Sequence, residues 1–208
     1  IQYEDKKEVL PVIQTTTGLE YEITSKIKKL VETNKPTVGI TQVEGQTAQF
    51  QNIQNLLGQR YNVETVSLSD VVPAKVTALL MGGVADSLSG DEYQHLSDYL
   101  NRGGNLFLTQ NRVRANLQLK QENPIQTNNI DLVDDYGFAI SENLVTDKIC
   151  GRVNVQQQMG PIRMNVPMEY PLLPVVRSFN NNEPIVAGLE QIQLVFASEI
   201  TQDSASMG

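Results

Sequence analysis

The stretch 79-LLMGGVADSLSGDEYQHLSDYLNRGGNLFL-108 decides the fold class of this chain. Two apolar runs of strand length, Thr77–Met81 and Asn105–Thr109, overlap its ends, and between them lies a polar segment with apolar residues at helical spacing. Ser89–Glu92 fits a capping box, and Gly103 can supply the left-handed conformation that ends a helix. The stretch therefore predicts a strand, a helix and a second strand.

Within the predicted helix, Tyr93, Leu96 and Leu100 form the face that we expect to be buried. His95 lies roughly opposite that face on the helical wheel, so we predict a surface histidine rather than a catalytic base. Gly82–Gly83 is interpreted as a tight turn from strand to helix, because neither a third glycine nor a Lys-Ser/Thr pair follows it.

The same alternation precedes this stretch. Residues Thr17–Glu32 and Gln46–Gly58 have helical spacing, with Phe50, Ile53 and Leu57 on one face of the second, whereas Thr37–Thr41 and Tyr61–Leu68 have strand patterns. Strands that alternate with helices of this length are typical of parallel βαβ units. The sequence predicts an α/β fold with a largely parallel sheet flanked by helices.

The second part of the chain has a different pattern. We predict a long loop over Gln110–Asn129, a short helix over Ile130–Tyr136 that Gly137 ends, and a strand over Asn143–Thr146. Beyond Cys150, alternating valines and frequent prolines predict hairpins and extended segments.

This β-rich part is expected to end in a strand at Gln191–Ala197. We therefore expect one α/β domain over residues 1–208, with a βαβ core over 16–150 and extended β segments over 151–208 packed on that core.

The composition excludes several classes of function. The formal net charge of the 208 residues is −8, which argues against nucleic-acid binding, and the basic run Lys26–Lys29 is expected to be a solvated face. One cysteine and one histidine cannot form a usual zinc site. No run of about 18 apolar residues is present. Because the chain begins at Ile1, we expect a piece of a longer protein whose membrane segments lie outside it.

No catalytic signature is present in the sequence. The turn Met81–Ala85 lacks the serine or cysteine of a nucleophile elbow. Cys150 is expected to be a half-buried structural thiol, although a reactive thiol is an alternative. Asp131, Asp134 and Asp135 are expected to form a solvated helix face, and catalysis by a carboxylate pair stays open. We predict no catalytic residue, no metal and no cofactor.

The order of several short segments resembles the extracytoplasmic region of gliding-motility-type ABC transporter auxiliary proteins. The segments that carry the resemblance are Tyr61–Asp70, Val72–Pro73, Ala78–Gly83, Leu88–Glu92, Tyr99–Gly104, Arg114–Gln118, Asp134–Gly137, Asn143–Asp147, Cys150–Gly151, Val155–Gln157, Tyr170–Pro171, Pro184–Ile185, Gly188–Leu189 and Phe196–Ser198. The resemblance covers nearly the whole chain from about Thr16 onward.

The resemblance implies a flavodoxin-like or class I glutamine-amidotransferase-like fold, located in the periplasm and paired with an ABC permease and a separate ATPase. The resemblance extends to a related domain of an intraflagellar transport component, and it implies a non-enzymatic role there as well. Amidotransferase activity is not implied, since the turn Met81–Ala85 lacks the cysteine.

We therefore predict a non-catalytic binding or interaction domain. In open α/β sheets, ligands bind at the carboxyl ends of the strands, which here predicts a neutral polar ligand, such as a sugar, at Thr41, Gln42, Gly82, Gly83, Gln110 and Asn111. Two alternatives stay open: a hydrolase or transferase that uses Cys150 or a carboxylate pair, and a purely structural module that contacts proteins through Gly160–Pro174.

Overall fold

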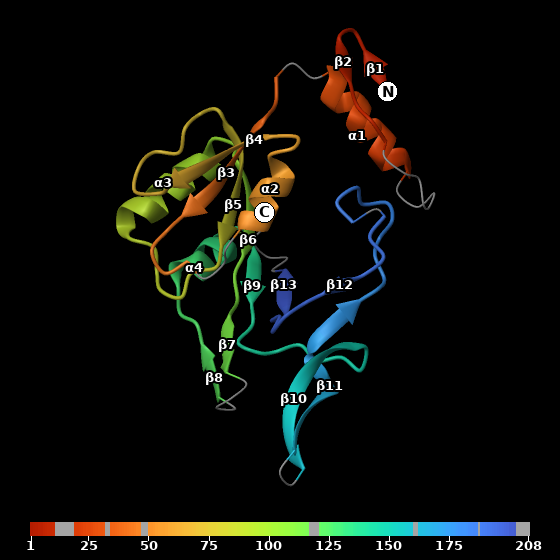
Figure 1. The fold of residues 1–208 in the computed structure, drawn as a ribbon. Coiled ribbons are helices and arrows are strands. Elements are labelled where there is room, and N and C mark those ends of the chain that lie inside the picture. The colour runs from red at the N-terminus through yellow and green to blue at the C-terminus, as the bar shows by residue number, and fades with distance from the viewer. Residues whose placement is uncertain are drawn as a thin grey trace. The chain divides into compact units, whose positions relative to one another are not determined.

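The computed structural model describes residues 1–10, 19–31, 34–46, 50–116, 121–159, 162–186 and 188–202. The chain divides into two compact units, and each is described by itself (Figure 1). Unit 1 comprises Ile1–Val43, Ala48–Met81 and Asp91–Leu108, and unit 2 comprises Glu44–Thr47, Gly82–Gly90 and Thr109–Gly208. The single domain that the sequence predicts stays a prediction.

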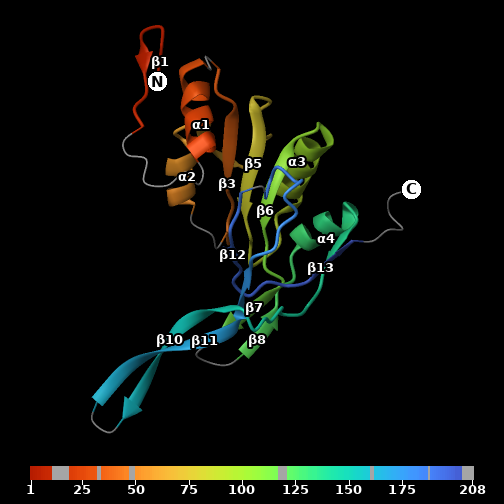
Figure 2. The ribbon, with the colours of Figure 1, turned by 90° about the vertical axis from the view of Figure 1, so that its right-hand side faces the viewer.

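Unit 1 is built around a four-stranded parallel sheet in the order β4-β3-β5-β6. Its strands are β3 (Thr37–Gln42), β4 (Asn62–Ser67), β5 (Val76–Gly82) and β6 (Asn105–Thr109). Its helices are α1 (Leu19–Val31), α2 (Gln51–Leu57) and α3 (Gly90–Asn101), and a short hairpin joins β1 (Gln2–Tyr3) to β2 (Lys6–Lys7). In Figure 2 the strands stand between α2 and α3. The predicted mixed α/β fold with a parallel sheet is confirmed.

The core of unit 1 is packed closely against the middle of β3. A Cβ atom at Gly39 would lie 2.7 Å from both Leu79 Cδ2 and Val66 Cγ2, so only glycine fits between these two buried side chains. Leu79, Met81 and Leu96 are almost wholly buried. The apolar run of β5, which the sequence predicts as a strand, therefore contributes to the core of this unit.

Helix α3 ends as its sequence predicts. Gly103 has φ = +85°, and the amide groups of Gly103 and Gly104 donate hydrogen bonds to Leu100 O (2.9 Å) and Tyr99 O (3.1 Å). The predicted buried face is wrong in part: α3 buries Leu96 and Tyr99, whereas Tyr93 and Leu100 are half-buried. Tyr99 can be buried because its hydroxyl bonds both the N–H and the C=O of Asn105, each at 3.1 Å.

The prediction of a surface histidine is also wrong. His95 is half-buried, and its Nδ1 lies 2.8 Å from Leu68 O. Because a carbonyl oxygen only accepts, this nitrogen carries the proton. His95 therefore ties α3 to the chain that follows β4.

We predict that Tyr99 makes the stability of unit 1 fall at high pH. Burial is the main cause that raises the pKa of Tyr99 above its usual 10.0. A raised pKa in the folded state means that the stabilisation is fully present below the pKa of the unfolded chain and is lost as the pH rises through the folded value. Urea unfolding should show that the free energy of unfolding falls between a pH below 10 and a pH above 10. This fall should be smaller in the Tyr99→Phe variant. Because that variant leaves both Asn105 backbone groups without the hydroxyl, we expect it to cost about 1–2 kcal/mol at neutral pH.

Unit 2 consists mainly of antiparallel strand pairs. Its elements are β7 (Val113–Asn116), β8 (Gln121–Pro124), α4 (Asn128–Asp135), β9 (Phe138–Ile140), β10 (Cys150–Met159), β11 (Ile162–Val176), β12 (Ile192–Gln193) and β13 (Ile200–Gln202). The pairs are β7 with β8, β9 with β13, and the three-stranded order β10-β11-β12. Figure 2 shows β10 and β11 side by side as a long ribbon, which confirms the predicted hairpins beyond Cys150.

Helix α4 is confirmed, with earlier bounds than predicted. Thr127 is its N-cap and accepts a hydrogen bond from the amide of Asn129, and Gly137 (φ = +80°) follows its end. Two other predictions for this unit are wrong. The predicted loop contains the β7–β8 pair, and Asn143–Thr146 is not a strand, since Val145 makes a single backbone bond to Ala197 O.

Other boundaries differ from the prediction as well. The predicted strand Gln191–Ala197 shortens to β12, and α2 begins only at Gln51 with Ile53 exposed. Gly58 is the C-cap of α2 in a right-handed conformation. Parts of several predicted segments lie outside the described residues: 17–18 and 32 of the first helix, 47–49 of the second, 117–120 of the predicted loop, and Gly160–Pro161.

Within the described part of the chain, the helices are all too short or too polar to cross a membrane.

Candidate functional site

The six residues predicted at the carboxyl ends of the strands fall into the two units. Thr41 and Gln42 end β3 in unit 1, where Thr41 is buried and its hydroxyl donates to Leu80 O at 3.5 Å, whereas Gln42 is exposed. The other four, Gly82, Gly83, Gln110 and Asn111, belong to unit 2. Only within unit 2 do the contacts show predicted residues brought together.

Gln110 clamps the chain that follows β5. Its Oε1 accepts from Val84 N (3.1 Å) and Asn129 Nδ2 (3.3 Å), and its Nε2 donates to Val84 O (3.2 Å) and Asn111 O (2.8 Å). A side-chain amide has two donor and two acceptor positions, so all four are used within the protein. A ligand that binds Gln110 would therefore have to replace one of these bonds.

Gly83 is a glycine because β6 passes close to it. A Cβ atom at this position would lie 2.6 Å from Thr109 O, a backbone atom, and 3.2 Å from Gln110 Cα. Helix α3 begins only at Gly90. The interpretation of Gly82–Gly83 as a tight strand-to-helix turn is therefore wrong, and the glycine allows a close approach of two chain segments.

A second clamp, which the sequence reading missed, holds the same connection. Asn128 Oδ1 accepts from Leu88 N (2.8 Å), Asn128 Nδ2 donates to Leu88 O (2.9 Å), and Asn128 N donates to Ser87 Oγ (3.2 Å). The fully buried Asn129 links this clamp to Gln110. We call Gln110, Asn128 and Asn129 the amide clamp. The sequence indicates this clamp through Thr127-Asn128-Asn129 at the beginning of α4, because threonine and asparagine are favoured at helix N-caps.

The residues considered for catalysis are scattered. Cys150 is a free, half-buried thiol at the start of β10, as predicted, and it pairs with Pro174 in the ladder. Asp131, Asp134 and Asp135 are exposed on α4. Among the described residues, no group of three or more His, Cys, Asp or Glu side chains could hold a metal ion.

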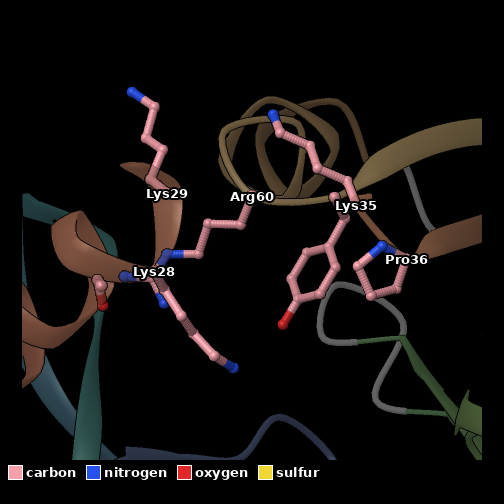
Figure 3. A pocket seen from close by; sticks show the side chains of 7 residues that line it. Lys28, Lys29, Lys35, Pro36 and Arg60 are labelled. Atoms are coloured by element: carbon pink, nitrogen blue, oxygen red, sulfur yellow. The ribbon is translucent and has the colours of Figure 1, made fainter. Parts of the chain in front are cut away.

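A cavity of about 230 Å³ lies in unit 1 at the amino ends of β3 and β4, opposite to the predicted edge. It is lined by Ser25, Lys28, Lys29, Lys35, Pro36, Arg60 and Tyr61, which we call the basic pocket (Figure 3). Lys28 and Lys29 are exposed, as expected of a solvated face, but the sequence alone did not show that they lie beside Lys35 and Arg60. The signal was that Lys35–Pro36 and Arg60–Tyr61 each immediately precede a strand of a parallel sheet, so that they meet at one edge.

Lys29 of the basic pocket has a carboxylate partner in Glu8. Lys29 and Lys26 both pair with Glu8, and the Lys29 ammonium is the larger of the two causes that lower the pKa of Glu8 below its usual value. Because the folded pKa is lowered, this tie is present at neutral pH and is lost as the pH falls through that value.

Comparisons with known proteins place the chain in a family. Residues 35–207 match the sequence model of the family described as "ABC-type uncharacterized transport system". An "Uncharacterized protein" of Borreliella burgdorferi is 24% identical over 157 residues, which are 71% of this chain and 31% of that protein, so the chain spans less than a third of this relative's length. The solved "mmIFT52 N-terminal domain" shares the fold, with a TM-score of 0.53 and 15% identity over 81% of this chain and 69% of that chain. Because the family match covers most of its length, the chain belongs to the auxiliary component family of an ABC-type transport system.

Proposed function

We propose that this chain is a non-catalytic, extracytoplasmic domain that contacts the permease and ATPase assembly of an ABC transport system, with the permease as its direct partner. The observation that carries the proposal is the family match over residues 35–207. The turn that would hold a nucleophile in an amidotransferase-like enzyme is Met81–Ala85, which has no side chain able to attack a substrate. Cys150, the one thiol of the chain, lies in a strand instead.

The β10–β11 ribbon supports an interaction role, because its two faces differ in polarity. Directly opposite residues of an antiparallel pair lie on the same face. Val153 pairs with Met168 and Val155 with Val166, and Met164 follows on the same face by alternation. The side chains of Met164 and Met168 are 50% and 45% exposed.

The other face of the ribbon is polar. It carries Arg152 opposite Glu169, Asn154 opposite Pro167, and Gln156 opposite Asn165. Exposed methionines adapt to irregular partner surfaces, so we propose the apolar face as the contact with the permease. Met164, Val166 and Met168 lie within Gly160–Pro174, the segment through which a purely structural module is expected to contact proteins.

The test is recovery of the permease when the full-length protein is purified from cells that make both. The double variant Met164→Asp/Met168→Asp should recover at least about tenfold less permease, since each charge would be buried in an apolar contact. Asn165→Asp adds the same charge to the polar face and should recover the usual amount. Equal recovery with all three proteins would show that this face is not the contact.

The proposed location is tested by protease accessibility of the full-length protein in intact cells, spheroplasts and broken membranes. We expect cleavage within this domain as soon as the outer barrier is removed in spheroplasts. Cleavage only after the inner membrane is broken would place the domain in the cytoplasm and would favour the alternative of an amidotransferase-like enzyme.

A neutral polar ligand, such as a sugar, at the carboxyl ends of the strands stays part of the proposal. The exposed Gln42 and Asn111 are the side chains that could reach such a ligand without breaking the amide clamp. A glycan panel screened by thermal shift tests it, and melting temperatures that stay unchanged across the panel count against ligand binding.

A further inference from the structure

We propose that the apolar face of the β10–β11 ribbon is a site of reversible methionine oxidation, at Met164 and Met168, and that this oxidation weakens the contact with the permease. Only the second part rests on the proposed function, since the oxidation itself is a property of the chain and can be measured on the protein alone. Three observations support it: the exposure of the two thioethers, the burial of Met81, and the apolar surroundings of the ribbon methionines.

The thioethers of Met164 and Met168 are open to a small reagent in solution. Their side chains are 50% and 45% exposed. Both belong to β11 and are separated by an even number of positions, so they leave the same face of the strand. A thioether that an oxidant can reach is a common site of sulfoxide formation, which enzymes can reverse.

Met81 gives the contrast that makes the oxidation selective. The side chains that the structure describes include those of Met81, Met164 and Met168 among the methionines of the chain. Met81 is 0% exposed at the end of the apolar run of β5. An oxidant reaches this sulfur only when the structure around it opens. Among these three side chains, oxidation should therefore be confined to the ribbon.

The surroundings of the ribbon methionines make the product unfavourable in an apolar contact. Met168 lies opposite Val153, and Val166 is its neighbour on the same strand and face. Valine side chains have no donor for a sulfoxide oxygen, and a polar group buried without a partner opposes binding. Met164 lies opposite Gln157 instead. We therefore assign the larger part of the effect to Met168.

The reaction balances with a peroxide as the oxidant. The thioether sulfur gives an electron pair to one oxygen of hydrogen peroxide, so that an S–O bond forms while the O–O bond breaks. The other oxygen takes up the remaining proton and leaves as water, which means that the sulfur is oxidised and the peroxide reduced by two electrons. A methionine sulfoxide reductase reverses the change with two thiols, which become a disulfide while the oxygen leaves as water.

The first measurement uses the whole protein without the permease. The folded protein is incubated with hydrogen peroxide, and mass spectrometry of its peptides follows the gain of one oxygen atom at each methionine. We expect Met164 and Met168 to be oxidised at least about tenfold faster than Met81, because only Met81 needs an opening of the fold. Protein unfolded in guanidinium is the control and should lose this difference. Equal rates in the folded protein would overturn the proposal.

The second measurement is recovery of the permease from membranes by the full-length protein, treated with peroxide and freed of it before mixing. Oxidation should lower recovery at least about fivefold, since a polar group enters an apolar contact. Treatment with methionine sulfoxide reductases A and B, which together reduce both sulfoxide epimers, should restore it.

The matched control is Met164→Leu/Met168→Leu, which keeps apolar side chains of similar volume but has no sulfur at either position. This variant should recover the same amount of permease with and without peroxide. If peroxide lowers its recovery as much as that of the wild type, the target is another residue and the proposal is wrong.

Failure here is separable from failure of the proposed function, because Met164→Asp/Met168→Asp tests the contact itself. If that variant loses the permease while the oxidised protein keeps it, the face is the contact but oxidation does not regulate it. If both keep the permease, the proposed contact fails and the regulation fails with it, whereas the selective oxidation of the protein alone still identifies the modification site.

Discussion

Replacing Gly83 by alanine should lower the free energy of unfolding of unit 2 by about 1–3 kcal/mol, the usual cost of overpacking. The added methyl group would lie 2.6 Å from Thr109 O, and backbone at the end of a strand cannot rotate away as a long side chain can. Moving that backbone would also disturb Gln110, which holds both polar groups of Val84.

The matched control is Gly90→Ala in the same unit. A Cβ atom at Gly90 meets no other atom within 4 Å, and Gly90 is the first residue of α3. Alanine there should stabilise by up to about 0.5 kcal/mol, because it reduces the freedom of the unfolded chain. Urea unfolding followed by circular dichroism measures both. If Gly83→Ala is as stable as Gly90→Ala, the close approach of the two segments does not exist in solution.

Replacing Gln110 by glutamate should have an effect of similar size, about 1–3 kcal/mol, because Gln110 is half-buried and a carbonyl that loses its donor there and faces a charge is left unsatisfied. The carboxylate would keep the acceptor side of the clamp. On its donor side, however, it would face Val84 O and Asn111 O, two carbonyl oxygens that need a donor. The connection between β5 and α3 should loosen locally.

Asn111→Asp introduces the same charge one residue further along, at an exposed side chain, and should change stability by less than about 0.5 kcal/mol. Hydrogen exchange at the amide of Val84 gives the local measurement, since this group donates to Gln110 Oε1. We expect faster exchange in Gln110→Glu and unchanged exchange in Asn111→Asp. Unchanged exchange in both variants would contradict a structural role for Gln110.

The parts of the fold that local chemistry controls were predictable. Strand β6 has the predicted bounds, Asn105–Thr109, and α3 ends at Gly103 with the left-handed conformation that only glycine adopts easily. Gly137, with its positive φ, follows the end of α4 as predicted, whereas the N-cap Thr127 lies inside the predicted loop and was missed. In each case the residues that decide the boundary are within a few positions of it.

The parts that depend on distant partners were not predictable. Strand β7 alternates Val113 and Ala115 with Arg114 and Asn116, but β8 (Gln121–Pro124) has no apolar residue before its proline and is defined only by its pairing with β7. Tyr99 is buried because Asn105 satisfies its hydroxyl, and helical spacing alone cannot show that. Asn143–Thr146 has the composition of a strand, but it makes no ladder.

The candidate site was likewise predictable only where local sequence decides it. The carboxyl ends of the strands could be located from the sequence, yet the saturation of Gln110 depends on Asn129, nineteen positions away. The basic pocket likewise brings Lys35 and Arg60 together through the parallel pairing of β3 with β4, and adds Lys28 from α1.

The β10–β11 ribbon also determines where another chain could add a strand. Beyond the part that β12 covers, the outer side of β11 runs from Ile162 to Tyr170 and carries Pro167 near its middle, which has no N–H to donate. The sequence of β10 contains no proline from Cys150 to Met159, and β10 is the terminal strand of its sheet. An incoming strand therefore finds an uninterrupted row of backbone donors only along β10, and self-association by edge pairing is directed to that side of the ribbon.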